Sequence, residues 1–106
     1  WRAWRYGLHC PTTLTTRRRR GAAAARRVWA CYAIGCAVAN NAGNQAEAGR
    51  LGLLADLRAA LRQHAGSAEV AREACRAIGN AVANNADNQA EAGRLGLLAD
   101  LGAALR

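Results

Sequence analysis

Apolar residues recur along this chain with the spacing of amphipathic helices. In residues 51–63, Leu54, Leu57 and Leu61 stand at positions i, i+3 and i+7, which places them on one helix face. A longer segment, residues 68–84, carries a second apolar stripe, made of Val70, Ala74, Ala77, Ile78, Ala81 and Val82. No segment alternates with period two over a useful length, and β-branched residues are sparse. The pattern therefore predicts an all-α chain.

Turn and cap residues divide these helices into a short unit followed by longer ones. Residues 44–48 are predicted to form a short helical turn, which Gly49 breaks to allow a sharp bend. Ser67 is predicted to cap the helix of residues 68–84, with Glu69 in its first turn favoured by the helix dipole.

The helical pattern occurs twice in the sequence. Residues 30–62 and 74–106 are identical at 29 of 33 positions, and the four differing pairs are Tyr32/Arg76, Cys36/Asn80, Gly43/Asp87 and Arg58/Gly102. Self-similarity at a fixed step of 44 residues indicates a solenoid.

One unit of this repeat has too little apolar surface to fold alone. Residues 45–88 contain only eight large aliphatic side chains, so stacking on neighbouring units must supply the rest of the core. We expect a third helix over about residues 23–41, a full repeat over about 44–87 and a partial repeat over about 88–106. This organisation predicts a fragment of a longer array.

All of the excess positive charge lies before the first complete unit. Residues 1–46 contain eight Arg and no acidic residue, whereas residues 47–106 contain seven of each. Residues 1–21 show no helical period and are predicted to be a disordered leader that precedes the repeat region, residues 22–106. This leader, with its run of Arg17, Arg18, Arg19 and Arg20, has several interpretations. It is a nucleic-acid-binding arm, a nuclear-import signal or part of a transit peptide, or else a solvated charge run or translated non-coding sequence.

The candidate chemistry is sparse. Cys10, Cys31, Cys36 and Cys75 fit no metal-ligand spacing, and we interpret them as buried free thiols of an intracellular protein, cytoplasmic or nuclear. Two histidines, His9 and His64, stand apart from any acid or nucleophile at a telling spacing. We therefore expect no catalytic site, no metal and no cofactor. No apolar run is long enough to predict a membrane span.

The order of these landmarks resembles the armadillo repeat. The matching positions are Asn44 and Gln45 at the start of the unit, Gly49 at the bend, and a Leu-rich second helix. The third helix matches through Glu69 and Val70 at its start and through Ala74, Ala77, Ile78 and Asn80. The resemblance covers about residues 25–106. It implies a right-handed α-α superhelix, with one complete repeat flanked by two partial ones, whose third helices line a concave groove.

In importin-α-like members of that family, a Trp and an Asn four residues later hold an extended peptide. Here the two positions fall on Tyr32 and Cys36 in one copy and on Arg76 and Asn80 in the other, so each copy keeps half of the pair. The predicted groove surface is Tyr32, Cys36, Asn40, Arg72, Arg76, Asn80 and Asn84.

This surface suits an acidic or amphipathic protein segment better than a basic one. The sequence thus predicts a protein–protein interaction scaffold, with nucleic-acid binding through the leader as the alternative. A solvated helix face is the other interpretation of residues 72–84.

Overall fold

The computed structural model describes residues 9–106, with the side chain of Arg19 and those from residue 21 onward. This part of the chain is all-α, as the apolar pattern predicts, and contains no strand. Its helices are α2 (His9–Val38), α3 (Ala42–Arg50), α4 (Leu53–Gln63), α5 (Ala68–Val82), α6 (Ala86–Leu95) and α7 (Leu97–Leu105).

The first helix is longer than the sequence pattern predicts. Disorder was expected over residues 1–21, but residues 9–21 are helical and continue into the expected third helix as α2. Arg and Ala are strong helix formers, and extending an existing helix is easier than nucleating a new one. Pro11 lies in the first turn, where its missing N–H breaks no hydrogen bond. Residues 1–8 lie outside the described part.

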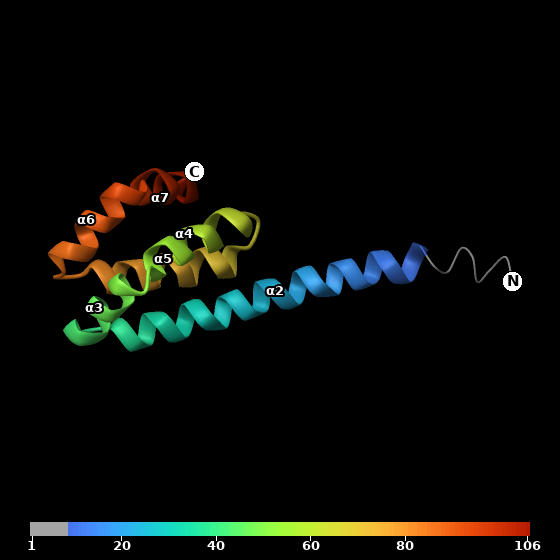
Figure 1. Cartoon of the computed structure of the whole chain (residues 1–106). Coiled ribbons are helices and arrows are strands. Elements are labelled where there is room, and N and C mark those ends of the chain that lie inside the picture. Colours follow the sequence, from blue (N-terminus) through green and yellow to red (C-terminus); the bar gives the residue numbers. More distant parts are fainter. Residues whose placement is uncertain (1–8) are drawn as a thin grey trace, which may run out of the picture.

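Helices that are equivalent in the repeat lie beside each other and run in the same direction (Figure 1). α2 packs along α5, α3 contacts α6, and α4 contacts α7. α4 and α5 run antiparallel to each other in the middle of the molecule. The described chain is elongated: its principal extents are 64 × 26 × 19 Å.

The bend between the first two helices of each copy is made by a different glycine from the one predicted. Gly49 lies inside α3, whereas Gly52 has φ 75° and its repeat equivalent Gly96 has φ 77°. Glycine adopts this left-handed conformation without the penalty that a Cβ brings. Gly49 has another role: a Cβ there would overlap Oδ1 of Asn88 on α6.

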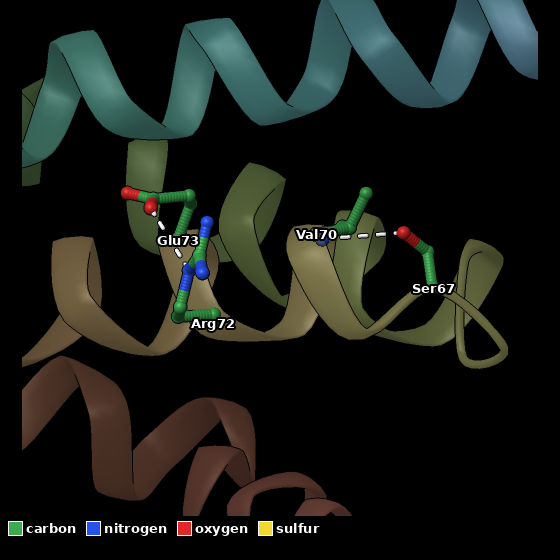
Figure 2. Close-up of polar contacts among 4 residues, drawn as sticks. All are labelled: Ser67, Val70, Arg72 and Glu73. Atoms are coloured by element: carbon green, nitrogen blue, oxygen red, sulfur yellow. Dashed lines mark hydrogen bonds and ion pairs between the residues drawn. The ribbon is translucent and has the colours of Figure 1, made fainter.

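Side-chain oxygens cap three of the helices. Ser67 Oγ accepts a hydrogen bond from Val70 N at 3.2 Å, which confirms the predicted cap of α5 (Figure 2). The sequence analysis did not identify the caps of α3 and α6. There the side-chain oxygens of Asn41 and Asn85 each accept the backbone N–H three residues later, at 2.9 Å. These contacts satisfy helix-terminal N–H groups that have no partner within the helix.

The core is thin and rich in alanine, as the composition indicates. α4 contributes Leu54 and Leu57, and α5 contributes Val70, Ala74 and Ala77, all of them buried. α2 approaches α5 closely at Gly35, where an added Cβ would stand 3.5 Å from Ala77 Cα. Small residues thus allow close helix approach where large side chains are few.

Two buried amides join the copies across this core. Asn88 Nδ2 on α6 donates to Gln45 O at 2.9 Å and to Ala81 O at 2.8 Å. Gln45 Nε2 on α3 donates to Asn80 O at 2.9 Å and to Ala83 O at 3.2 Å, near the end of α5. Three of the four acceptors, Asn80 O, Ala81 O and Ala83 O, lie at the C-terminal end of α5, where carbonyls have no partner within the helix.

A candidate partner-binding surface on α2 and α5

The residues predicted to line a groove fall on two adjacent helices and the turns that follow them. Tyr32 and Cys36 lie on α2, and Arg72, Arg76 and Asn80 lie on α5. Asn40 follows α2, and Asn84 follows α5. The structure brings some of these side chains together and gives the others structural roles.

Tyr32 and Arg76 meet across the two helices. The guanidinium carbon of Arg76 lies 5.7 Å from the centroid of the Tyr32 ring, which is a cation–π contact. Trp29, one turn earlier on α2, packs edge-on against Tyr32 with their ring centroids 6.2 Å apart. Both rings remain accessible, since Trp29 is 69% exposed and Tyr32 43% exposed. We call Trp29, Tyr32 and Arg76 the aromatic–Arg cluster.

Trp29 was not among the residues predicted to line the groove. The sequence did contain a signal for it, because an aromatic residue three positions before Tyr32 lies on the same face of a helix. The cluster offers two aromatic faces and one cation to solvent. It could bind a carboxylate through Arg76 and an apolar side chain through the rings.

Asn80 is tied to its neighbours instead of being free to bind a partner. Its side-chain Nδ2 donates to Gly35 O of α2 at 3.0 Å, and its backbone oxygen accepts from Gln45. Cys36, the equivalent residue on α2, is exposed and replaces this amide with a thiol.

Asn40 and Asn84 have a conformational role. Their φ angles are 53° and 54°, and no other non-glycine residue in the described part of the chain has a positive φ. Asn tolerates this left-handed region better than other residues with a Cβ, and it commonly follows the last turn of a helix. The α2 and α5 helices therefore end at Val38 and Val82, a few residues earlier than the sequence pattern predicts.

Arg72 pairs with a carboxylate buried between α5 and α2. Its Nε lies 3.3 Å from Oε1 of Glu73, whose side chain projects from α5 toward α2 (Figure 2). Glu73 is only 7% exposed, and its Oε2 has no hydrogen-bond partner among the described residues. A buried carboxylate was not predicted, because the alanine stripe of this helix gives no sign of it.

Three cysteines are described, and all are free thiols. Burial raises the pKa of Cys31, the negative charge of Glu73 raises it further, and Arg27 opposes both. Burial also raises the pKa of Cys75. The exposed position of Cys36 differs from the buried environment predicted for these residues.

The basic run is the other site predicted from the sequence. Arg17–Arg20 lie in α2, and the only side chain described among them, that of Arg19, is exposed. Asp100 pairs with Arg58 and so joins α7 to α4. Among the described side chains, those of Arg19 and residues 21–106, no three His, Cys, Asp or Glu residues gather as metal ligands.

No helix in the described range is both long enough and apolar enough to cross a membrane. Comparison with protein-family models, with curated proteins and with solved structures finds no match to this chain. Its functional assignment accordingly depends on the geometry of the aromatic–Arg cluster and of the helices that carry it.

Proposed function

We propose that this chain is an interaction scaffold of armadillo-like, right-handed superhelical organisation that acts by binding and not by catalysis. In this proposal α2 and α5 are the third helices of successive repeats, and an extended acidic or amphipathic protein segment lies across them. The free thiols favour an intracellular setting.

The observation that carries the proposal is the contact between Arg76 and Tyr32, which builds one exposed surface from two successive units. Residues of large aromatic area and Arg are those that most often dominate binding at protein interfaces. Arg72 adds a second exposed cation on α5. An acidic segment would meet two guanidinium groups there and an apolar platform beside them.

A direct test uses a synthetic peptide of about twelve residues in which Glu alternates with Leu and Pro, labelled for fluorescence anisotropy. Pro keeps the peptide extended. A peptide with Lys in place of Glu tests the sign of the charge. We expect the Glu peptide to bind and the Lys peptide to bind at least tenfold more weakly, because like charges repel across a desolvated contact.

The variants assign binding to the aromatic–Arg cluster. Tyr32→Ala and Arg76→Ala remove the two members of the contact, and Arg62→Ala removes an exposed Arg from α4 as the matched control. We expect each cluster variant to weaken the Glu peptide about fivefold to thirtyfold. Equal affinity for the Glu and Lys peptides, or an equal loss of Glu-peptide affinity in Arg62→Ala, would contradict the proposal.

A second candidate is nucleic-acid binding through the basic half of α2. The observation that favours it is the run Arg17–Arg20, which lies where α2 extends beyond the other helices (Figure 1). Binding to single-stranded RNA should then weaken steeply between about 50 and 200 mM salt. Replacing all four Arg with Gln should abolish it, while binding of the Glu peptide persists.

A further inference from the structure

The contact between α2 and α5 is formed by two different faces of one repeated helix. On α2 the buried residues include Cys31, Gly35 and Val38. On α5 they include Ala77 and Ala81, which are 0% and 1% exposed. A Cβ added at Gly35 would stand 3.5 Å from Ala77 Cα, so the two helices lie close together at a point where neither has a large side chain.

Each of these faces occurs a second time in the molecule, where the described residues leave it exposed or only half-buried. The α5 residues Cys75, Gly79 and Val82 are the repeat equivalents of Cys31, Gly35 and Val38. We call them the tail face. Cys75 and Val82 are half-buried, Gly79 is exposed, and a Cβ at Gly79 would meet no atom within 4 Å.

The complementary face is uncovered on α2. Ala33 and Ala37 are exposed, although they are the repeat equivalents of the buried Ala77 and Ala81. With Ala30, the equivalent of the fully buried Ala74, they form what we call the head face. Trp29 stands exposed at its edge.

A groove beside the tail face exposes a second set of apolar residues. It has a volume of about 1060 Å³ and lies between α5, α7 and the end of α4. On α7, Leu98 is 74% exposed and Leu105 is 90% exposed. Their repeat equivalents on α4, Leu54 and Leu61, are 1% and 8% exposed, in the copy whose groove is occupied by α5.

We propose that a second copy of this chain docks head to tail, its α2 head face packing on the α5 tail face and filling the groove beside α7. The template is inside the molecule, because α5 already makes this contact with α2 and α4. The interface uses two different patches, so it is heterologous and leaves a free head and a free tail on every assembly. Such an assembly grows as an open chain.

Two residue differences between α2 and α5 affect how well the head face fits the tail face. Arg26 stands on α2 where α5 has the fully buried Val70, so its aliphatic stem must cover apolar surface while its charge reaches solvent. Cys36 stands where α5 has Asn80, whose side chain donates to Gly35 O. In the assembly, the equivalent hydrogen bond to Gly79 O of the first copy is missing.

These features define a test by sedimentation velocity from about 1 µM to about 1 mM protein. Ala33→Arg blocks the head face and Gly79→Arg blocks the tail face. Both positions are exposed on helices, so neither change disturbs the core. Ala55→Arg, at an exposed position on α4, is the matched control. Circular dichroism verifies that every variant keeps its helix content.

We expect the wild-type chain and Ala55→Arg to increase in mass with concentration, without stopping at a dimer. Each blocked variant alone should remain a monomer. An equimolar mixture of the two should form a 1:1 complex and nothing larger, because one intact head and one intact tail remain. Cys36→Asn should restore the missing hydrogen bond and tighten assembly roughly threefold to tenfold.

Several results would overturn the proposal: a monomeric wild type at the highest concentration, a closed dimer, assembly in either blocked variant, or no complex in the mixture. Both blocked variants keep Trp29, Tyr32 and Arg76, so peptide binding can still be measured on the blocked monomers.

Discussion

The backbone of Gly49 lies against the side-chain amide of Asn88. A Cβ at Gly49 would overlap Oδ1 of Asn88, whereas a Cβ at Gly93, the repeat equivalent of Gly49, would meet no atom within 4 Å. Asn88 cannot withdraw freely, because it is 3% exposed and its Nδ2 donates two hydrogen bonds. The glycine at this repeat position is therefore required in the first copy, whereas the second copy has room for a side chain.

This difference predicts opposite effects for the same substitution. Gly49→Ala should lower the free energy of unfolding by about 2 kcal/mol, because the added methyl overpacks a fixed buried group. Gly93→Ala should raise it by about 0.5 kcal/mol, since Ala is the better helix former. Urea unfolding followed by circular dichroism measures both. Equal effects at the two positions would show that Asn88 is not held as described.

The left-handed conformation of Asn84 predicts a second pair of substitutions. Asn84→Ala should lower the free energy of unfolding by about 1 kcal/mol, because Ala has a Cβ and no side-chain hydrogen bond to offset the strain. Asn84→Gly should leave it unchanged or raise it slightly. If the two variants unfold alike, the residue acts through its side chain and not through its backbone.

The raised pKa of Cys31 predicts a loss of stability in alkali. Below the ordinary thiol pKa of about 8.5, both folded and unfolded states hold the proton, and pH has no effect through this group. Above it, the unfolded chain releases the proton while the folded chain retains it, so stability falls as pH rises.

The measurement is the unfolding midpoint in urea at pH values between about 8 and 10. Cys31→Ala should flatten this dependence, and Cys36→Ser, at the exposed thiol, should keep it. Alkylation by iodoacetamide with peptide mapping gives an independent check, because Cys36 should react faster than Cys31 or Cys75. A wild-type pH dependence that persists in Cys31→Ala would assign the effect to other groups.

Glu73 predicts a stabilising substitution. Its carboxylate is buried between α5 and α2 and has one oxygen without a partner. Glu73→Gln removes the buried charge and should raise the free energy of unfolding by about 1 kcal/mol. Glu69→Gln, in the exposed first turn of the same helix, should lower it by about 0.5 kcal/mol through the helix dipole. Destabilisation by Glu73→Gln would indicate that the carboxylate is stabilised by Arg72.

Local signals in the sequence predicted most of the helices. The periods of Leu54, Leu57 and Leu61 and the cap at Ser67 depend on neighbours a few residues away, so they could be identified without a structure. The role of Gly49 could not be identified, because it is set by Asn88 from the next copy. Gly52, which makes the actual turn, lies three residues away and is equally invariant between the copies.

The candidate site also contains residues whose surroundings could be predicted from the sequence and residues whose surroundings could not. Tyr32 and Arg76 were assigned from a repeat offset, and the structure brings them together. Asn80 was assigned in the same way, but a backbone carbonyl of α2 already engages its amide. Sequence equivalence locates a residue in the unit, whereas its availability depends on the contacts that the neighbouring unit makes.

The contact of Gly35 with Ala77 has a consequence for how such a chain can change length. α2 and α5 each carry both halves of this contact, one on each side, at a fixed step of 44 residues. Inserting one whole step would place the same pair of small residues at the new junction. We therefore expect a tandem duplication of one 44-residue step to preserve this close helix packing, whereas an insertion of another length would shift its register.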